Sequence, residues 1–152
     1  MNNFCKSVEV RWADIDANQH MRHSVYADLC THARIEWLAE NGFTFADFAA
    51  HAIGPVLFKE QTEYFREVTL GERLDIDVTL AAISADGRRW CIRQHLYKSD
   101  QVLAARHEVH GAWLDLKHRR LASPPPELLA VFDALPRTED FQRSDSPNSA
   151  SE

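Results

Sequence analysis

Three side chains that could carry out acid–base chemistry stand at alternate positions near the start of the chain, at Asp16, Asn18 and His20. They fall in a short polar loop between a predicted strand and a predicted helix. A carboxylate can act on a carbonyl group as general base or nucleophile. The first N–H groups of a helix can stabilise the negative charge that develops on the carbonyl oxygen. The loop is therefore the strongest candidate for a catalytic site.

The segments on either side of this loop predict the elements that position it. Alternating apolar residues predict a half-buried strand over 4–12, with Phe4, Val8, Val10 and Trp12 on one face. A long amphipathic helix is expected to follow, with Ser24 as its N-cap and Asn41-Gly42 as its end. Its apolar side carries Val25, Leu29, Ala33 and Trp37. Thr44 and Asp47 predict a capping box for a short second helix that reaches about His51 and is closed by Gly54-Pro55.

The segment from Val56 to Leu116 alternates in hydrophobicity with a period of two, which predicts strands. Turns are predicted at Asp86-Gly87 and Ser99-Asp100, so the strands form an antiparallel meander. Such a sheet can bury its apolar face only if the long helix lies across it. The sequence therefore predicts an α+β fold in which a curled antiparallel β-sheet wraps around one long central α-helix.

The length of 152 residues fits one domain, which we expect over residues 1–135 with its core at 4–120. The prolines at 124–126 predict a short C-terminal helix at about 126–135, and the polar composition of 136–152 predicts a mobile tail. The net charge of −6 argues against a general nucleic-acid binder. We find no membrane-spanning apolar run and no secretory signal, so we expect a cytoplasmic protein that does not act in a membrane.

This order of elements, together with the segment Asp14 to His20 and Tyr26, resembles the hotdog-fold thioesterases over residues 4–120. In the 4-hydroxybenzoyl-CoA thioesterase-like group, the second Asp of an Asp-x-Asp pair is catalytic, and that position corresponds to Asp16. The segments 16–20 and 63–68 are also similar to motifs of the plant acyl-carrier-protein thioesterases. The resemblance implies a hotdog fold, an acyl-CoA substrate, and a homodimer or homotetramer with its active sites at the subunit interface.

The sequence departs from these families at three places. Gln19 stands where the thioesterase-like group usually has Gly, and Met21-Arg22-His23 replaces Val-Asn-Asn of the plant motif. Val68 stands at the position of the plant Cys, so a Cys–His nucleophile is not available there. Glu67 remains as a candidate for the reacting group, and Asp16 is the stronger candidate of the two.

The resemblance implies a role for each candidate residue. Asp16 would act as general base or nucleophile, Asn18 would position water or the thioester, and His20 would hold Asp16 or relay a proton. The candidate substrate-binding residues are Tyr26, Glu63, Glu67, Arg88 and Arg89. His20 and His23 lack a third ligand at recognisable spacing, so we expect neither a metal site nor a cofactor.

Three other functions fit the same pattern. The first is hydrolysis of acyl groups carried on acyl carrier protein, and the second is acyl-CoA binding without catalysis, because a fold does not determine a function. The third is a hotdog hydratase, which would need a longer characteristic segment that we do not find in this chain.

Overall fold

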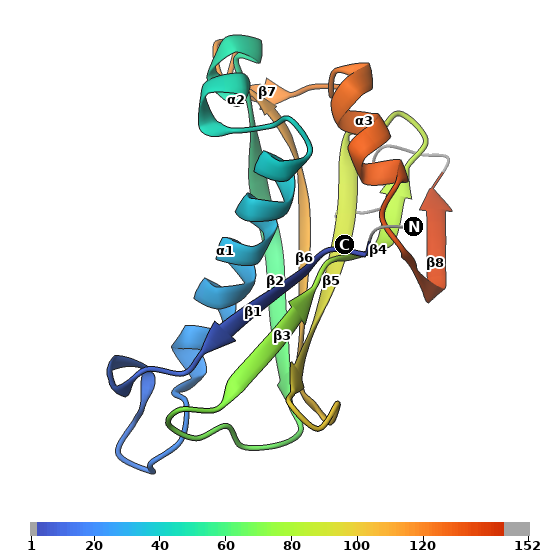
Figure 1. The fold of residues 1–152 in the computed structure, drawn as a ribbon. Coiled ribbons are helices and arrows are strands. Elements are labelled where there is room, and N and C mark those ends of the chain that lie inside the picture. The colour runs from blue at the N-terminus through green and yellow to red at the C-terminus, as the bar shows by residue number, and fades with distance from the viewer. Residues whose placement is uncertain (1–2, 145–152) are drawn as a thin grey trace.

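One long helix lies across the concave face of an eight-stranded sheet in the computed structural model, which describes residues 3–144 (Figure 1). The helices are α1 (His23–Glu40), α2 (Phe45–His51) and α3 (Pro126–Asp133), with a single 3-10 turn, η1 (Trp12–Asp14). The strands are β1 (Cys5–Glu9), β2 (Ile53–Tyr64), β3 (Arg73–Asp77), β4 (Thr79–Ser84), β5 (Arg89–Lys98), β6 (Leu103–Asp115), β7 (Arg120–Leu121) and β8 (Arg137–Ser144).

Strand β5 lies in the middle of the sheet and pairs along one edge with β6. Its other edge pairs with β3 near Leu96 and with β4 near Trp90. The sheet continues from β3 to β1, from β4 to β8, and from β6 to β2 and β7. The predicted simple meander is wrong in one respect, because β2 pairs with β6 and not with β3. The segment 65–72 carries the chain from the edge strand β2 to β3, which lies on the other side of β5.

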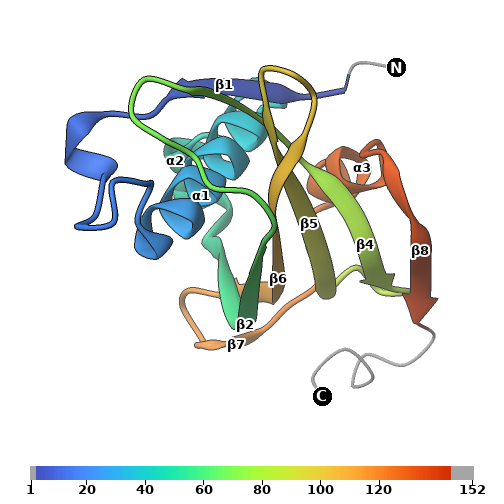
Figure 2. The same ribbon diagram turned by 90° about the horizontal axis from the view of Figure 1, so that it is seen from below.

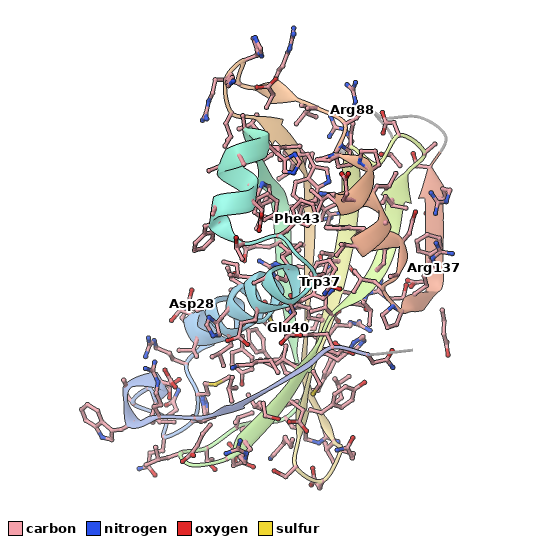
Figure 3. All side chains as sticks on the ribbon, turned by 45° about the horizontal axis from the view of Figure 1, so that its top comes forward. Asp28, Trp37, Glu40, Phe43, Arg88 and Arg137 are labelled. Atoms are coloured by element: carbon pink, nitrogen blue, oxygen red, sulfur yellow. The ribbon has the colours of Figure 1, made fainter. Side chains whose placement is uncertain are left out.

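The curvature of the sheet encloses α1, as the predicted fold class requires (Figure 2). One half of the core surrounds the C-terminal end of α1, where Phe132 of α3 packs against Trp37 and Trp90. In the other half, Tyr26 and Cys30 of α1 pack with Leu74 and Leu96 of the sheet. Figure 3 shows Trp37 and Phe43 directed into the space between helix and sheet. The N-terminal end of α1, where the candidate loop lies, is therefore anchored on a packed core.

The ends of the elements confirm some predictions and correct others. The capping box is present, since the Asp47 carboxylate accepts hydrogen bonds from Thr44 N–H at 2.8 Å and Thr44 Oγ1 at 2.6 Å. Helix α1 ends at Glu40 with Asn41 as its C-cap, as predicted, but it begins at His23, so Ser24 is not its N-cap. Trp12 lies in η1 and not in the predicted strand, and it is 83% exposed.

Strand β2 begins before its predicted position, and strand β8 was not predicted. Gly54 and Pro55 lie inside β2, and α2 is ended instead by Ala52, which adopts a left-handed conformation. The segment Arg137–Ser144, predicted as part of a mobile tail, forms strand β8 parallel to β4. The rest of that predicted tail, 145–152, lies outside the described residues. None of the helices within 3–144 is long and apolar enough to cross a membrane.

Candidate active site

The loop that carries Asp16 is closed by its own backbone. An isolated bridge pairs Ile15 with Met21, the Asp16 N–H donates to the His20 carbonyl oxygen at 3.0 Å, and the Gln19 N–H donates to the Asp16 carbonyl oxygen at 3.0 Å. Gln19 adopts a φ of 66°, in the left-handed region that glycine enters most easily. Gln19 therefore makes the turn that the family position normally assigns to Gly, and the departure leaves the loop intact.

The carboxylate of Asp16 is oriented by groups of the same loop. Its Oδ1 accepts hydrogen bonds from the N–H of Asn18 at 2.9 Å and of His20 at 3.4 Å. Its Oδ2 lies 3.3 Å from His20 Nδ1. The Asp16 side chain is 27% exposed, so water can reach it. The predicted contact between His20 and Asp16 is present in the structure.

The neighbouring carboxylate, Asp14, has a structural environment. It is 2% exposed and accepts hydrogen bonds from the N–H and guanidinium of Arg11, with Arg11 Nη2 to Asp14 Oδ1 at 2.9 Å. The hydrogen bond from the Arg11 guanidinium holds the pKa of Asp14 below its usual range. The Asp14 carbonyl also accepts the N–H of Arg22 at 2.9 Å. Asp14 thus fastens the loop, while Asp16 is free to face a ligand.

A cavity of about 480 Å³ opens beside Asp16. Three segments form it, namely the loop itself, the start of α1, and the residues that follow β2. Its lining residues are Asp16, Asn18, His20, Met21, His23, Tyr26, Tyr64, Phe65, Arg66 and Glu67. The Met21 N–H donates to the Val68 carbonyl oxygen at 2.7 Å, which joins the loop to the segment after β2. Residues far apart in the sequence are therefore brought to one site.

The first residue of α1, His23, lines this cavity, and the first N–H groups of the helix lack acceptors within the described chain. Among the hydrogen bonds of residues 3–144, none uses the N–H of His23 or Ser24 as donor, whereas the Val25 N–H donates to the Arg22 carbonyl oxygen at 3.1 Å. The free N–H groups therefore belong to the first two residues of α1. The helix dipole adds positive potential at the same end. This end of α1 can stabilise a developing oxyanion.

Two tyrosines form one wall of the cavity. The rings of Tyr26 and Tyr64 meet edge to face with their centroids 5.0 Å apart. Tyr26 is buried, and its burial raises the pKa of the phenol to about 12, so Tyr26 stays neutral and can donate a hydrogen bond. Tyr64 is 52% exposed, and its ring can pack against a bound ligand.

The structure brings together five of the predicted site residues, Asp16, Asn18, His20, Tyr26 and Glu67. The other three predicted site residues do not line the cavity. Glu63 forms an ion pair with Arg106 at 2.6 Å, Arg88 donates to Ser123 Oγ at 3.1 Å, and the Arg89 guanidinium lies over the Phe58 ring. Figure 3 shows Arg88 well separated from Asp28 in the first turns of α1. Glu63 and Glu67 do not share a strand face, because β2 ends at Tyr64.

The sequence reasoning missed Tyr64, Phe65 and Arg66, all of which line the cavity. All three lie in the alternating segment 56–116, whose period predicts regular strands. The regular pairing of β2 with β6 ends just before these residues, and the N–H groups of Phe65 and Arg66 both donate to the Ala104 carbonyl oxygen. A strand pairing defines this end and the local sequence does not.

Known structures with the same arrangement are hotdog-fold proteins. A hypothetical protein of Staphylococcus aureus, solved in complex with CoA, is 21% identical and aligns over 89% of this chain and 87% of its own, with a TM-score of 0.79. A 1,4-dihydroxy-2-naphthoyl-CoA thioesterase of Synechocystis is 20% identical over 88% of this chain and 98% of its own, with a TM-score of 0.78. A DHNA-CoA thioesterase of Staphylococcus aureus is 16% identical over 88% and 90%, with a TM-score of 0.77.

These alignments define the fold as the α+β hotdog fold. The model of the thioesterase-like superfamily matches residues 10–132 of the chain. The protein therefore belongs to the thioesterase-like superfamily and is a thioester hydrolase. No curated protein matches the chain.

Proposed function

We propose that this protein hydrolyses acyl-CoA thioesters and that Asp16 is the catalytic carboxylate. The observation that carries the proposal is the position of Asp16 in a cavity that also receives the start of α1, where the His23 and Ser24 N–H groups have no acceptor within residues 3–144. A CoA complex and CoA thioesterases among the proteins of similar fold support the choice of CoA.

The arrangement supports two routes through the same residues. As general base, Asp16 takes a proton from water, the hydroxide adds to the thioester carbonyl, and the oxyanion accepts hydrogen bonds from the start of α1. Collapse breaks the C–S bond, and the CoA thiolate takes up a proton. As nucleophile, Asp16 Oδ adds to the carbonyl, the C–S bond breaks and the CoA thiolate leaves, and water then cleaves the resulting acyl anhydride. In both routes Asn18 orients the water or thioester and His20 holds the carboxylate.

The catalytic role is tested by replacing Asp16 with Asn, which keeps the size of the side chain and removes its basicity. We expect kcat on acyl-CoA to fall by about a hundredfold or more, the scale of a lost acid–base group. Glu63→Gln is the matched control, because Glu63 lies outside the cavity, and it should leave kcat unchanged. An Asp16→Asn variant with the wild-type kcat would exclude the proposed role.

The two routes differ in the origin of the oxygen atom in the product. In a single turnover in ¹⁸O-labelled water with excess enzyme, the nucleophilic route leaves unlabelled oxygen from Asp16 in the acid, provided that water attacks the aspartyl carbonyl of the anhydride. Under that regiochemistry the label then appears in the peptide that contains Asp16, whereas the general-base route labels only the product.

The sequence at 16–20 also favours an acyl-carrier-protein thioester as an alternative substrate. Matched acyl groups on CoA and on carrier protein, compared by kcat/KM, separate the two substrates. A protein that binds acyl-CoA but turns over neither thioester would instead be the non-catalytic binder.

We also propose that the protein self-associates through the free edge of β2. Strand β2 pairs with β6 on one side only within the described chain, and Leu57 and Phe58 are 42% and 50% exposed. A long edge strand with exposed apolar side chains readily pairs with a second copy. The cavity lies at the C-terminal end of this strand, next to Tyr64, so such pairing would place it near the subunit interface.

A further inference from the structure

Three side chains of different metal-ligating types meet on the face of the sheet that is turned away from α1. Cys91 of β5 lies directly opposite His110 of β6 in the strand register, and Glu108 precedes His110 by two residues on the same face. His107 and Val109, which alternate with them along β6, are buried on the α1 side. The cluster shares no residue with the Asp16 cavity.

The ligand atoms converge on one point. The Cys91 Sγ lies 3.7 Å from His110 Nε2, His110 Nε2 lies 3.0 Å from Glu108 Oε1, and all three atoms lie within 4.8 Å of one another. In a tetrahedral zinc site, metal–ligand bonds of about 2.0 to 2.3 Å separate sulfur from nitrogen by about 3.5 Å and nitrogen from oxygen by about 3.4 Å. The separations in the structure come within about 0.4 Å of these values, so small side-chain adjustments admit an ion.

The Glu108 carboxylate is held in place by residues around it. Arg93 Nε donates to Glu108 Oε2 at 2.8 Å, which leaves Oε1 directed toward His110. The charge of Arg93 is in turn balanced by Asp140, through two hydrogen bonds at 2.8 and 3.0 Å. Residues that orient a ligating carboxylate in this way are typical of metal sites. The positive charge of Arg93 is therefore neutralised by two carboxylates and does not repel a cation strongly.

We propose that Cys91, Glu108 and His110 form a binding site for one divalent transition-metal ion of the zinc class, with water as a fourth ligand. Binding forms bonds from the metal to Cys91 Sγ, His110 Nε2 and Glu108 Oε1, and the thiol proton passes to solvent. The mixed sulfur, nitrogen and oxygen ligands favour Zn²⁺ or Co²⁺ over Mg²⁺ and Ca²⁺, which prefer oxygen ligands alone. The site is independent of the proposed thioester hydrolysis.

Cobalt is the probe for this site, because a thiolate bound to Co²⁺ gives a charge-transfer band that an imidazole or carboxylate does not give. Titration of the full-length protein with Co²⁺ should produce this band with one equivalent, and added Zn²⁺ should abolish it. Cys91→Ser should remove the band. Cys5→Ser is the matched control, because Cys5 is an exposed cysteine of β1 outside the cluster, and it should retain the band.

Because Cys91 is buried, its replacement could disturb folding, so a second variant is needed. His110 is only partly buried, and His110→Gln should weaken Co²⁺ binding by at least about tenfold while circular dichroism and thioester hydrolysis stay as in the wild type. The proposal is overturned if wild-type protein shows no thiolate band in excess Co²⁺, if the band survives in Cys91→Ser, or if folded His110→Gln binds Co²⁺ as tightly as the wild type.

Discussion

Two carboxylates of one short loop have different roles at the residue scale. Asp14 is buried and bonded to Arg11, whereas Asp16, two positions later, is partly exposed in a cavity. The 3-10 turn η1 ends at Asp14, and the extended residue Ile15 separates the two carboxylates. The local backbone therefore decides which Asp of the Asp-x-Asp pair can meet a ligand.

The left-handed conformation of Gln19 leads to a prediction about stability. Gln19→Gly should raise the free energy of unfolding by up to about 1 kcal/mol, because a residue with a Cβ pays a steric cost at a φ of 66°. Urea denaturation measures the change. Gln101 also has a φ of 66° but lies in the turn between β5 and β6, so Gln101→Gly is the control and should have a similar effect. A loss of stability in Gln19→Gly would show that the Gln side chain itself holds the loop.

A buried histidine predicts how stability depends on pH. His107 is 1% exposed, its Nδ1 lies 2.7 Å from Thr62 Oγ1, and its Nε2 has no hydrogen-bond partner among residues 3–144, with Glu60 Oε1 3.8 Å away. Burial, assisted by the nearby positive charge of Arg34, lowers the pKa of His107 to about 4. The folded protein therefore keeps His107 neutral where the unfolded chain already binds a proton.

The unfolded state binds more protons between about pH 6.5 and pH 4, so the free energy of unfolding should fall as pH decreases through this range. The contribution of His107 is at most about 3 kcal/mol by pH 4. In His107→Gln the pH dependence should be flatter, whatever the absolute stability of the variant. Urea denaturation at several pH values gives both slopes, and equal slopes would contradict the assignment.

Part of the candidate site could be predicted from sequence because it is local. Asp16, Asn18, His20 and Tyr26 lie within eleven consecutive positions, and the loop and helix signals around them are strong. Tyr64 and Arg66 join them through the pairing of β2 with β6, and no local pattern encodes that pairing. The start of α1 was misplaced by two residues, because Arg22 caps the helix without a side-chain hydrogen bond, whereas Ser24 is of a residue type that commonly caps helices.

At the scale of elements, β8 changes the picture of the C-terminal segment. Its sequence is polar, with Phe141 as its one large apolar residue, so composition alone predicted a tail. The strand forms because β4 offers an open edge, and because Asp140 binds Arg93 while Phe141 packs against the core. A strand at an edge needs few apolar residues, and for this reason hydrophobic periodicity did not find it.

Removal of β8 should destabilise the protein. A chain that ends at Pro136 exposes the edge of β4 and loses the partial burial of Phe141, so we expect the free energy of unfolding to fall by about 1 to 3 kcal/mol. Denaturant unfolding followed by tryptophan fluorescence measures this change. Phe141→Ala serves as the comparison, because it removes the ring contact and keeps the strand. Unaltered unfolding of the shortened chain would mean that β8 adds nothing to stability.

At the scale of the whole molecule, the order of the strands was the hardest feature to predict. The resemblance supplied a sheet curled around a helix, and the alternating pattern located most of its strands. Neither indicated that β3 and β4 pair with different parts of one edge of β5. That arrangement depends on a break in strand structure at Val78, between β3 and β4. The consequence is one sheet edge built from two separate pairs of strands and the opposite edge built from β2.

The free edge of β2 predicts the assembly of the protein. Phe58→Lys places a charge on this exposed edge and should shift the protein from dimer toward monomer, because a buried unpaired charge opposes association. Sedimentation velocity over a range of concentrations detects the shift. Val102→Lys is the control, since Val102 is similarly exposed but lies in the turn between β5 and β6. A wild-type protein that stays monomeric at all concentrations would refute assembly through β2.

The bond from the Met21 amide to the Val68 carbonyl has a consequence for how a ligand enters. It crosses between the two chain segments that border the cavity, so neither can swing outward without the other unless this bond breaks. Slow deuterium uptake at the Met21 amide would be the mark of such a fixed entrance.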